Sequence, residues 1–96
     1  MKLWIDDVRT PPDDGYIWCK SVNEAIATIN KTDDISLIDI DHDAGDYACD
    51  GGDYIKVLDY LEMHGYSYPI RIHSMNPVGV MNMRAIIRKN NWVEVF

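Results

Sequence analysis

Short apolar runs alternate along the chain with longer segments in which apolar residues recur at helical spacing. The runs predict strands, because they are brief, rich in β-branched or aromatic residues, and bounded by turn-forming residues. They lie at residues 2–5, 16–19, 35–40, 69–73 and 92–95, and the helical segments at 22–31, 53–64 and 77–90. Strands that alternate with helices in this order predict an α/β fold with a mostly parallel sheet.

The ends of the predicted helices carry their own signals. Ser21 and Glu24 match a capping box at the start of the first helix. Gly65 is a natural stop for the second. Asn76 is the expected cap of the third helix, with Pro77 at its first position.

The second strand is the irregular element of this scheme. Residues between Val8 and Tyr16 are too few for a helical crossover, which takes about a dozen residues or more. This strand is therefore either antiparallel to the first or attached to it by an unusual loop. We favour the antiparallel arrangement.

Length and charge narrow the class of protein. The chain has 96 residues and 47% hydrophobic content, which fits a single domain over residues 1–96. Its formal net charge of −7 argues against binding to duplex nucleic acid, but a local pocket for a small anion remains compatible with it. We expect a cytoplasmic protein with reduced cysteines and no membrane segment, because no long apolar stretch, signal peptide or paired-cysteine motif is present.

Polar residues gather where three predicted strands end. In open α/β sheets, ligands bind at the carboxyl ends of the strands. The residues at those ends are Asp6, Asp7 and Arg9 after the first strand, Asp41, His42 and Asp43 after the third, and His73, Ser74 and Asn76 after the fourth. We expect one site at this edge of the sheet.

The carboxylates at this edge predict a cation. Asp6, Asp7 and Asp41, with Asp43 nearby, would repel one another unless a positive ion lay between them. Mg²⁺ fits, because it takes oxygen ligands and commonly bridges carboxylates to phosphate. Arg9 is either a donor to that phosphate or a salt-bridge partner of the acids.

Two histidines and a helix start complete the candidate chemistry. His42 and His73 are suited to act as general acid and base, although each has an alternative as a histidine that only bonds to the backbone. Ser74 and Asn76 resemble an anion cradle, although plain capping by Asn76 explains part of the pattern. Asp39 lies inside an apolar strand and needs a partner, either Arg71 or the acidic cluster.

Three blocks of sequence resemble a known family. They are Trp4–Arg9 (WIDDVR), Asp41–Gly45 (DHDAG) and His73–Gly79 (HSMNPVG), the last followed by Asn82-Met83. Together they resemble the cyclic-phosphate processing receiver family, a branch of receiver-like domains found in bacteria and phages. The resemblance covers nearly the whole chain. Asp39 and Ala44 are mild departures from the family pattern.

The resemblance implies a compact three-layer, receiver-like (flavodoxin-like) fold. It has about five mostly parallel strands and about three helices, and the first and last helices of a receiver are missing or shortened. The implied activity is on cyclic phosphates of nucleotides, ADP-ribose or RNA ends. Signalling receivers also use a lysine after the final strand, which this sequence lacks, so a phosphoacceptor role for Asp41 is disfavoured.

The leading hypothesis is a phosphate-ester binding or hydrolysing domain, such as a cyclic phosphodiesterase, whose partner is a small phosphorylated ligand or nucleotide. In it Asp6, Asp7 and Asp41 hold Mg²⁺, Arg9, Ser74 and Asn76 hold the phosphate, His42 and His73 transfer protons, and Asp43 and Asn82 give support. One alternative is a stand-alone signalling receiver with Asp41 as a degenerate phosphoacceptor. Another is a protein-interaction module without catalysis.

Overall fold

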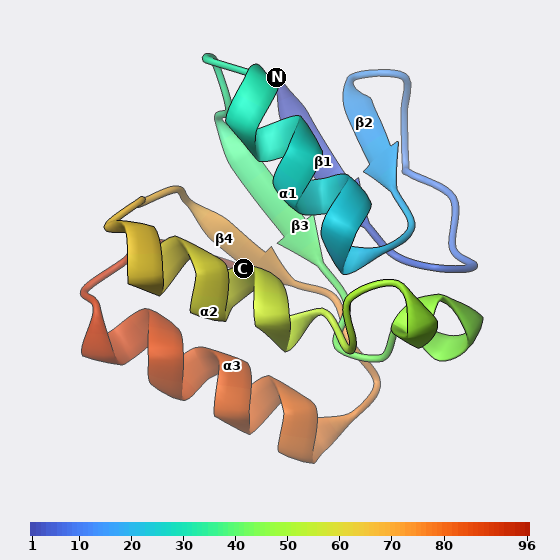
Figure 1. The fold of residues 1–96 in the computed structure, drawn as a ribbon. Coiled ribbons are helices and arrows are strands. Elements are labelled where there is room, and N and C mark those ends of the chain that lie inside the picture. Colours follow the sequence, from blue (N-terminus) through green and yellow to red (C-terminus); the bar gives the residue numbers. More distant parts are fainter.

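A five-stranded parallel sheet forms the centre of the computed structural model, which describes all residues 1–96. The strand order is β2-β1-β3-β4-β5, and every neighbouring pair is parallel. The strands are β1 (Lys2–Ile5), β2 (Tyr16–Cys19), β3 (Leu37–Ile40), β4 (Ile70–Ile72) and β5 (Glu94–Val95). This confirms the predicted α/β class and the receiver-like arrangement (Figure 1).

Three α-helices connect the strands, and their ends lie close to the predicted positions. They are α1 (Val22–Lys31), α2 (Ile55–His64) and α3 (Pro77–Lys89), and a short 3-10 helix, η1 (Gly45–Cys49), lies in the loop after β3. The Ser21 hydroxyl accepts a hydrogen bond from the Glu24 N–H. Gly65 ends α2 with φ of 68°. None of the helices has the length and apolar character needed to cross a bilayer.

The predicted antiparallel orientation of the second strand is wrong. β2 runs parallel to β1, with Lys2 opposite Tyr16 and Ile5 opposite Cys19. Residues 6–15 make the return without a helix (Figure 1). A loop of this length is sufficient, because an extended chain spans about 3.3 Å per residue and β1 has only 4 residues. The requirement for a helical crossover therefore does not apply to strands this short.

The two faces of the sheet are covered differently. Alternate strand residues, including Leu3, Ile5, Ile38, Ile40 and Ile70, join one buried cluster with the inner faces of all three helices. The helices lie together on this side of the sheet, as Figure 1 shows. This apolar layer is the core of the domain.

The opposite face has a loop in place of helices. The indole N–H of Trp4 donates to the backbone oxygen of Arg9 at 2.7 Å, and that of Trp18 donates to the backbone oxygen of Asp6 at 2.8 Å. The loop over residues 6–15 is thereby fastened to the strands from which these rings project. The expected three-layer arrangement is reduced on this face to a loop, in agreement with the expected loss of receiver helices.

Candidate functional site

The site lies at the carboxyl edge of the two central strands. After β1 the chain passes to β2 on one side, whereas β3 pairs with β1 on the other side. Such a reversal of strand order leaves a crevice at the strand ends where α/β proteins bind ligands. Asp6 and Asp7 follow β1 and Asp41 follows β3, so the fold brings these residues to that point.

One ligand atom each from Asp6, Asp7 and Asp41 lies within 4.8 Å of the others. Burial raises the pKa of Asp7 above its ordinary value, and the negative charges of Asp6 and Asp41 raise it further. A hard divalent cation would relieve this repulsion and accept carboxylate oxygens directly. The residues present therefore fit Mg²⁺ at this position.

Asp6 is the most constrained member of this group. Its side chain is 0% exposed, and it accepts hydrogen bonds from the backbone N–H groups of Val8 and Arg9 at 3.0 and 3.1 Å. The Nε2 atom of His73 lies 2.9 Å from its other oxygen. Burial opposes ionisation of Asp6, but these hydrogen bonds and the nearby imidazole outweigh it and lower its pKa. Asp6 is thus a preorganised carboxylate.

His73 is enclosed between two carboxylates. Its Nδ1 atom lies 2.5 Å from Asp39 and its Nε2 atom contacts Asp6, while its ring stacks on Trp4 with centroids 3.9 Å apart. A carboxylate only accepts, so both contacts are hydrogen bonds when both ring nitrogens carry protons. The side chain is 7% exposed. Asp39 also pairs with Arg71 at 3.2 Å, which accounts for a charge inside an apolar strand.

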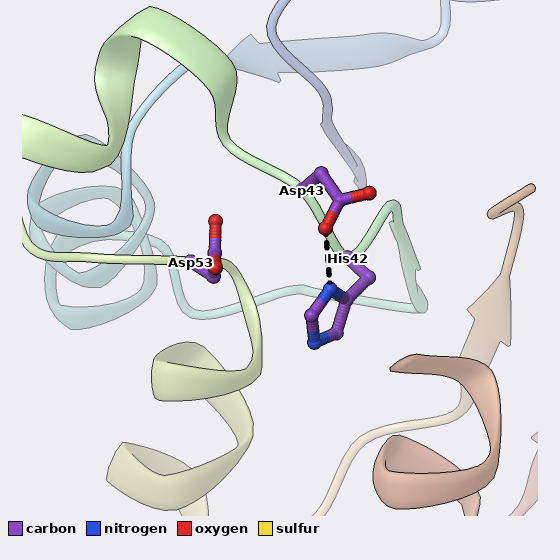
Figure 2. A group of neighbouring side chains, drawn as sticks. All are labelled: His42, Asp43 and Asp53. Atoms are coloured by element: carbon purple, nitrogen blue, oxygen red, sulfur yellow. Dashed lines mark hydrogen bonds and ion pairs between the residues drawn. The ribbon is translucent and has the colours of Figure 1, made fainter. Parts of the chain in front are cut away.

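His42 lies in a different environment. Its Nδ1 atom is 2.8 Å from Asp43, whose pKa is lowered by this hydrogen bond and, after it, by one from Asn76 (Figure 2). The imidazole is 14% exposed and packs so tightly on α3 that a Cβ at Gly79 would lie 2.4 Å from its Cγ atom. Its Nε2 atom has no hydrogen-bond partner in the protein.

Asp53 is a residue that the sequence interpretation did not select. Its carboxylate accepts a hydrogen bond from the Ala44 N–H at 3.1 Å, and Figure 2 shows it near His42 and Asp43. In the sequence, Asp53 reads only as the start of a helix. The sequence offers one indication of its role, because Asp53 follows the polar loop that contains Asp43. That position does not show which way the Asp53 side chain points.

The remaining predicted residues surround this edge to different degrees. Arg9 is exposed, and its Nη1 atom lies 3.5 Å from the backbone oxygen of His73. The Ser74 hydroxyl accepts from the Asn76 N–H at 3.2 Å, and Asn76 caps α3 by accepting from Gly79 at 3.0 Å. Asn82 is exposed on α3 and makes no hydrogen bond to the other predicted residues. The two histidines share no partner.

The structure has two larger surface hollows, and neither lies at this edge. One of about 500 Å³ follows the outer face of α3, and one of about 260 Å³ lies beside the end of α2. None of Asp6, Asp7 and Asp41 lines either hollow.

Comparison with known families is decisive for the class of protein. A family model described as "Cyclic-phosphate processing Receiver domain" matches residues 1–89. The chain belongs to this family. The match includes every predicted site residue of the cyclic-phosphate processing receiver domain and stops before β5. Searches of curated proteins and of solved structures found no match.

Membership confirms the resemblance drawn from the three sequence blocks, and the parallel sheet agrees with it. It supports a receiver-like domain in a family that processes cyclic phosphates.

Proposed function

We propose that this cyclic-phosphate processing receiver domain binds a small cyclic phosphate ester at its acidic edge and hydrolyses one ester bond with metal assistance. The observation that carries the proposal is the convergence of Asp6, Asp7 and Asp41 within 4.8 Å at the reversal point of the sheet. His42 directly follows Asp41 in the chain, and its Nε2 atom has no hydrogen-bond partner in the protein. Family membership supplies the substrate class.

In this proposal Asp6, Asp7 and Asp41 hold Mg²⁺. A bound Mg²⁺ supplies charge stabilisation for the phosphate as negative charge accumulates on its oxygens. The protein's own contribution is to fix the carboxylates beforehand. Asp6 is held by two backbone N–H groups and by His73, and the backbone N–H of His42 donates to Asp41 at 2.7 Å.

Arg9, Ser74 and Asn76 orient the phosphate. The Arg9 guanidinium already reaches the end of β4 and offers a planar set of donors to an anion. The Ser74 hydroxyl uses its oxygen as an acceptor, which leaves its proton available. The Asn76 amide donates to Asp43 at 3.2 Å, and Asp43 in turn contacts His42, so Asn76 connects the phosphate-orienting residues to His42.

Proton transfer is assigned to His42. Asp43 accepts from Nδ1 and fixes the tautomer in which Nε2 has a free lone pair. A water molecule forms a bond from its oxygen to phosphorus and gives its proton to Nε2. The ester P–O bond breaks, the departing sugar oxygen takes a proton from solvent, and Nε2 releases its proton to solvent. The net reaction adds one water and converts a cyclic diester into a monoester with a free hydroxyl.

His73 is a positioning residue in this scheme. Its two nitrogens are occupied by Asp6 and Asp39, and its ring is 7% exposed, so it has no open atom for the substrate. It acts through Asp6, which it holds in the orientation needed for the cation. This assignment differs from the acid–base role expected for His73 from the sequence.

The test is an assay of the purified domain with 2′,3′-cyclic mononucleotides and ADP-ribose 1″,2″-cyclic phosphate in the presence of Mg²⁺. Replacement of His42 by Gln is expected to lower kcat by about 10²–10⁴-fold, the usual contribution of a general base. His64→Gln is the matched control, because His64 is exposed at the far end of α2. Absence of turnover, or equal kcat in His42→Gln and the wild type, overturns the proposal.

A rival function is phosphorylation of Asp41 itself. It is favoured by the position of Asp41 at the end of β3, directly beside the pair Asp6 and Asp7. Incubation with acetyl phosphate, followed by intact mass measurement, separates the two functions. A phosphoryl adduct that disappears in Asp41→Asn supports the receiver chemistry.

A further inference from the structure

A second group of side chains that can hold a metal ion comes from the segment after β3. It consists of His42, Asp43 and Asp53, whose ligand atoms lie within 4.8 Å of one another (Figure 2). We infer that these three residues form a separate binding site for a borderline divalent cation of the Zn²⁺ type. Asp6, Asp7 and Asp41 do not belong to it.

The donor set distinguishes this group from an ordinary acidic cluster. It combines one imidazole nitrogen with two carboxylates, whereas the neighbouring group has oxygen donors only. Imidazole is a preferred ligand of zinc and similar transition metals, and Mg²⁺ favours oxygen. Three protein ligands with one open position are also typical of catalytic zinc sites. The two groups are therefore expected to differ in metal preference.

The side chains are held in place by bonds from outside the group. Asn76 donates to both oxygens of Asp43, at 3.2 and 3.4 Å, and the Ala44 N–H donates to Asp53. Such outer contacts orient metal ligands and affect metal affinity by about 10–100-fold. Asp43 and Asp53 are exposed, so an ion has direct access from solvent.

Gly79 explains how the ring of His42 reaches this position. The helix α3 begins directly against the imidazole, and any Cβ at Gly79 would lie 2.4 Å from Cγ and 2.6 Å from Cδ2. Because glycine has no side chain, this point in the first turn of α3 leaves room for the imidazole ring. The imidazole is consequently packed at 14% exposure, with Nδ1 directed to Asp43 (Figure 2).

Zinc binding has a consequence for the reaction. A cation held by His42 occupies the imidazole to which the proposed function assigns proton transfer. The ring is then not available to the attacking water. Zinc is therefore expected to inhibit Mg²⁺-dependent turnover. This consequence rests on the proposed function, whereas the site itself does not.

The test is calorimetric titration of the chelator-treated domain with zinc chloride, with excess Mg²⁺ present to occupy oxygen-only sites. One equivalent of zinc is expected to bind to the wild type. Both His42→Gln and Asp53→Asn are expected to weaken it by about tenfold or more. Asn at position 53 keeps an acceptor for the Ala44 N–H, so the loop contact survives. Asp7→Asn and His64→Gln are the matched controls and are expected to retain full affinity.

The shift of the histidine ring nitrogens in a long-range ¹H–¹⁵N spectrum shows which imidazole binds. Zinc is expected to move the His42 signals and to leave those of His64 unchanged. If His42→Gln fails to fold, Gly79→Ala provides the second variant, because it crowds the ring while favouring the helix. The proposed site is overturned if zinc does not bind to the wild type or if Asp53→Asn binds zinc with full affinity. It is also overturned if Asp7→Asn is the one variant that loses zinc binding. These outcomes do not depend on cyclic phosphate hydrolysis.

Discussion

The two faces of the sheet use neighbouring residues for opposite purposes. On the helix-covered face, Ile38 and Ile40 are 0% exposed and belong to the apolar core cluster. On the loop-covered face, Asp39 lies between them in sequence and is 1% exposed, yet it is charged and contacts His73 and Arg71. One strand therefore supplies both the stability of the domain and the framework of its site.

This difference shows how a small domain separates folding from chemistry. Apolar burial is non-directional and tolerates repacking, so it serves the face that only needs to exclude water. The charged face depends on direction, because a buried carboxylate is stable only when its partners are in place.

The largest expected effect is on the helix-covered face. Ile38→Ala removes a fully buried side chain and leaves a cavity, at a cost of about 2–5 kcal/mol in the free energy of unfolding. That is a substantial fraction of the roughly 5–15 kcal/mol available to a domain of this kind. Urea denaturation measures it. A loss below about 1 kcal/mol would contradict the assignment of Ile38 to the core.

An intermediate effect is expected on the loop-covered face. Asp39→Asn keeps the shape of the side chain but leaves His73 without its charged acceptor, at a cost of about 1–3 kcal/mol. The control is Arg71→Gln, whose cost should stay below about 1 kcal/mol because the arginine side chain is 42% exposed. Urea denaturation of both variants decides the point. Equal losses in the two variants would mean that His73 is not the partner that matters.

The smallest effect concerns the pH dependence of stability. The pKa of Asp6 is lowered in the folded state, so ionised Asp6 stabilises the fold above its unfolded pKa, and this stabilisation is lost as pH falls through the folded pKa. Asp6→Asn should therefore lower Tm most near neutrality, and the deficit should shrink in acid. The deficit of Ile38→Ala should stay the same over that range. Thermal unfolding at several pH values measures both, and a constant Asp6→Asn deficit would refute the electrostatic origin.

Much of the fold was predictable because its elements depend on local pattern. The capping by Ser21 and Asn76 and the stop at Gly65 are determined by neighbouring residues, and the structure has all three. The direction of β2 was not predictable in this way. It depends on whether residues 6–15 can return across a strand of 4 residues, and the rule for helical crossovers assumes longer strands.

The candidate site also has some features that could be predicted from the sequence and others that could not. Asp6, Asp7 and Asp41 were expected to meet because parallel strand ends share an edge, and the structure brings them together. The enclosure of His73 was not expected, because it depends on contacts with Asp39 and Trp4 across three strands. Asp53 became apparent only from the path of the loop after β3. Partners set by tertiary packing leave no periodic signal in a sequence.

The fastening of the 6–15 loop by two indole N–H groups has a spectroscopic consequence. Trp4 and Trp18 bond to backbone oxygens of Arg9 and Asp6, within the segment that carries two of the three acidic side chains. Any rearrangement of that segment changes the polarity around an indole ring. Two intrinsic fluorophores are thus bonded to the segment that carries Asp6 and Asp7, and their emission is expected to report a ligand bound there without an added label.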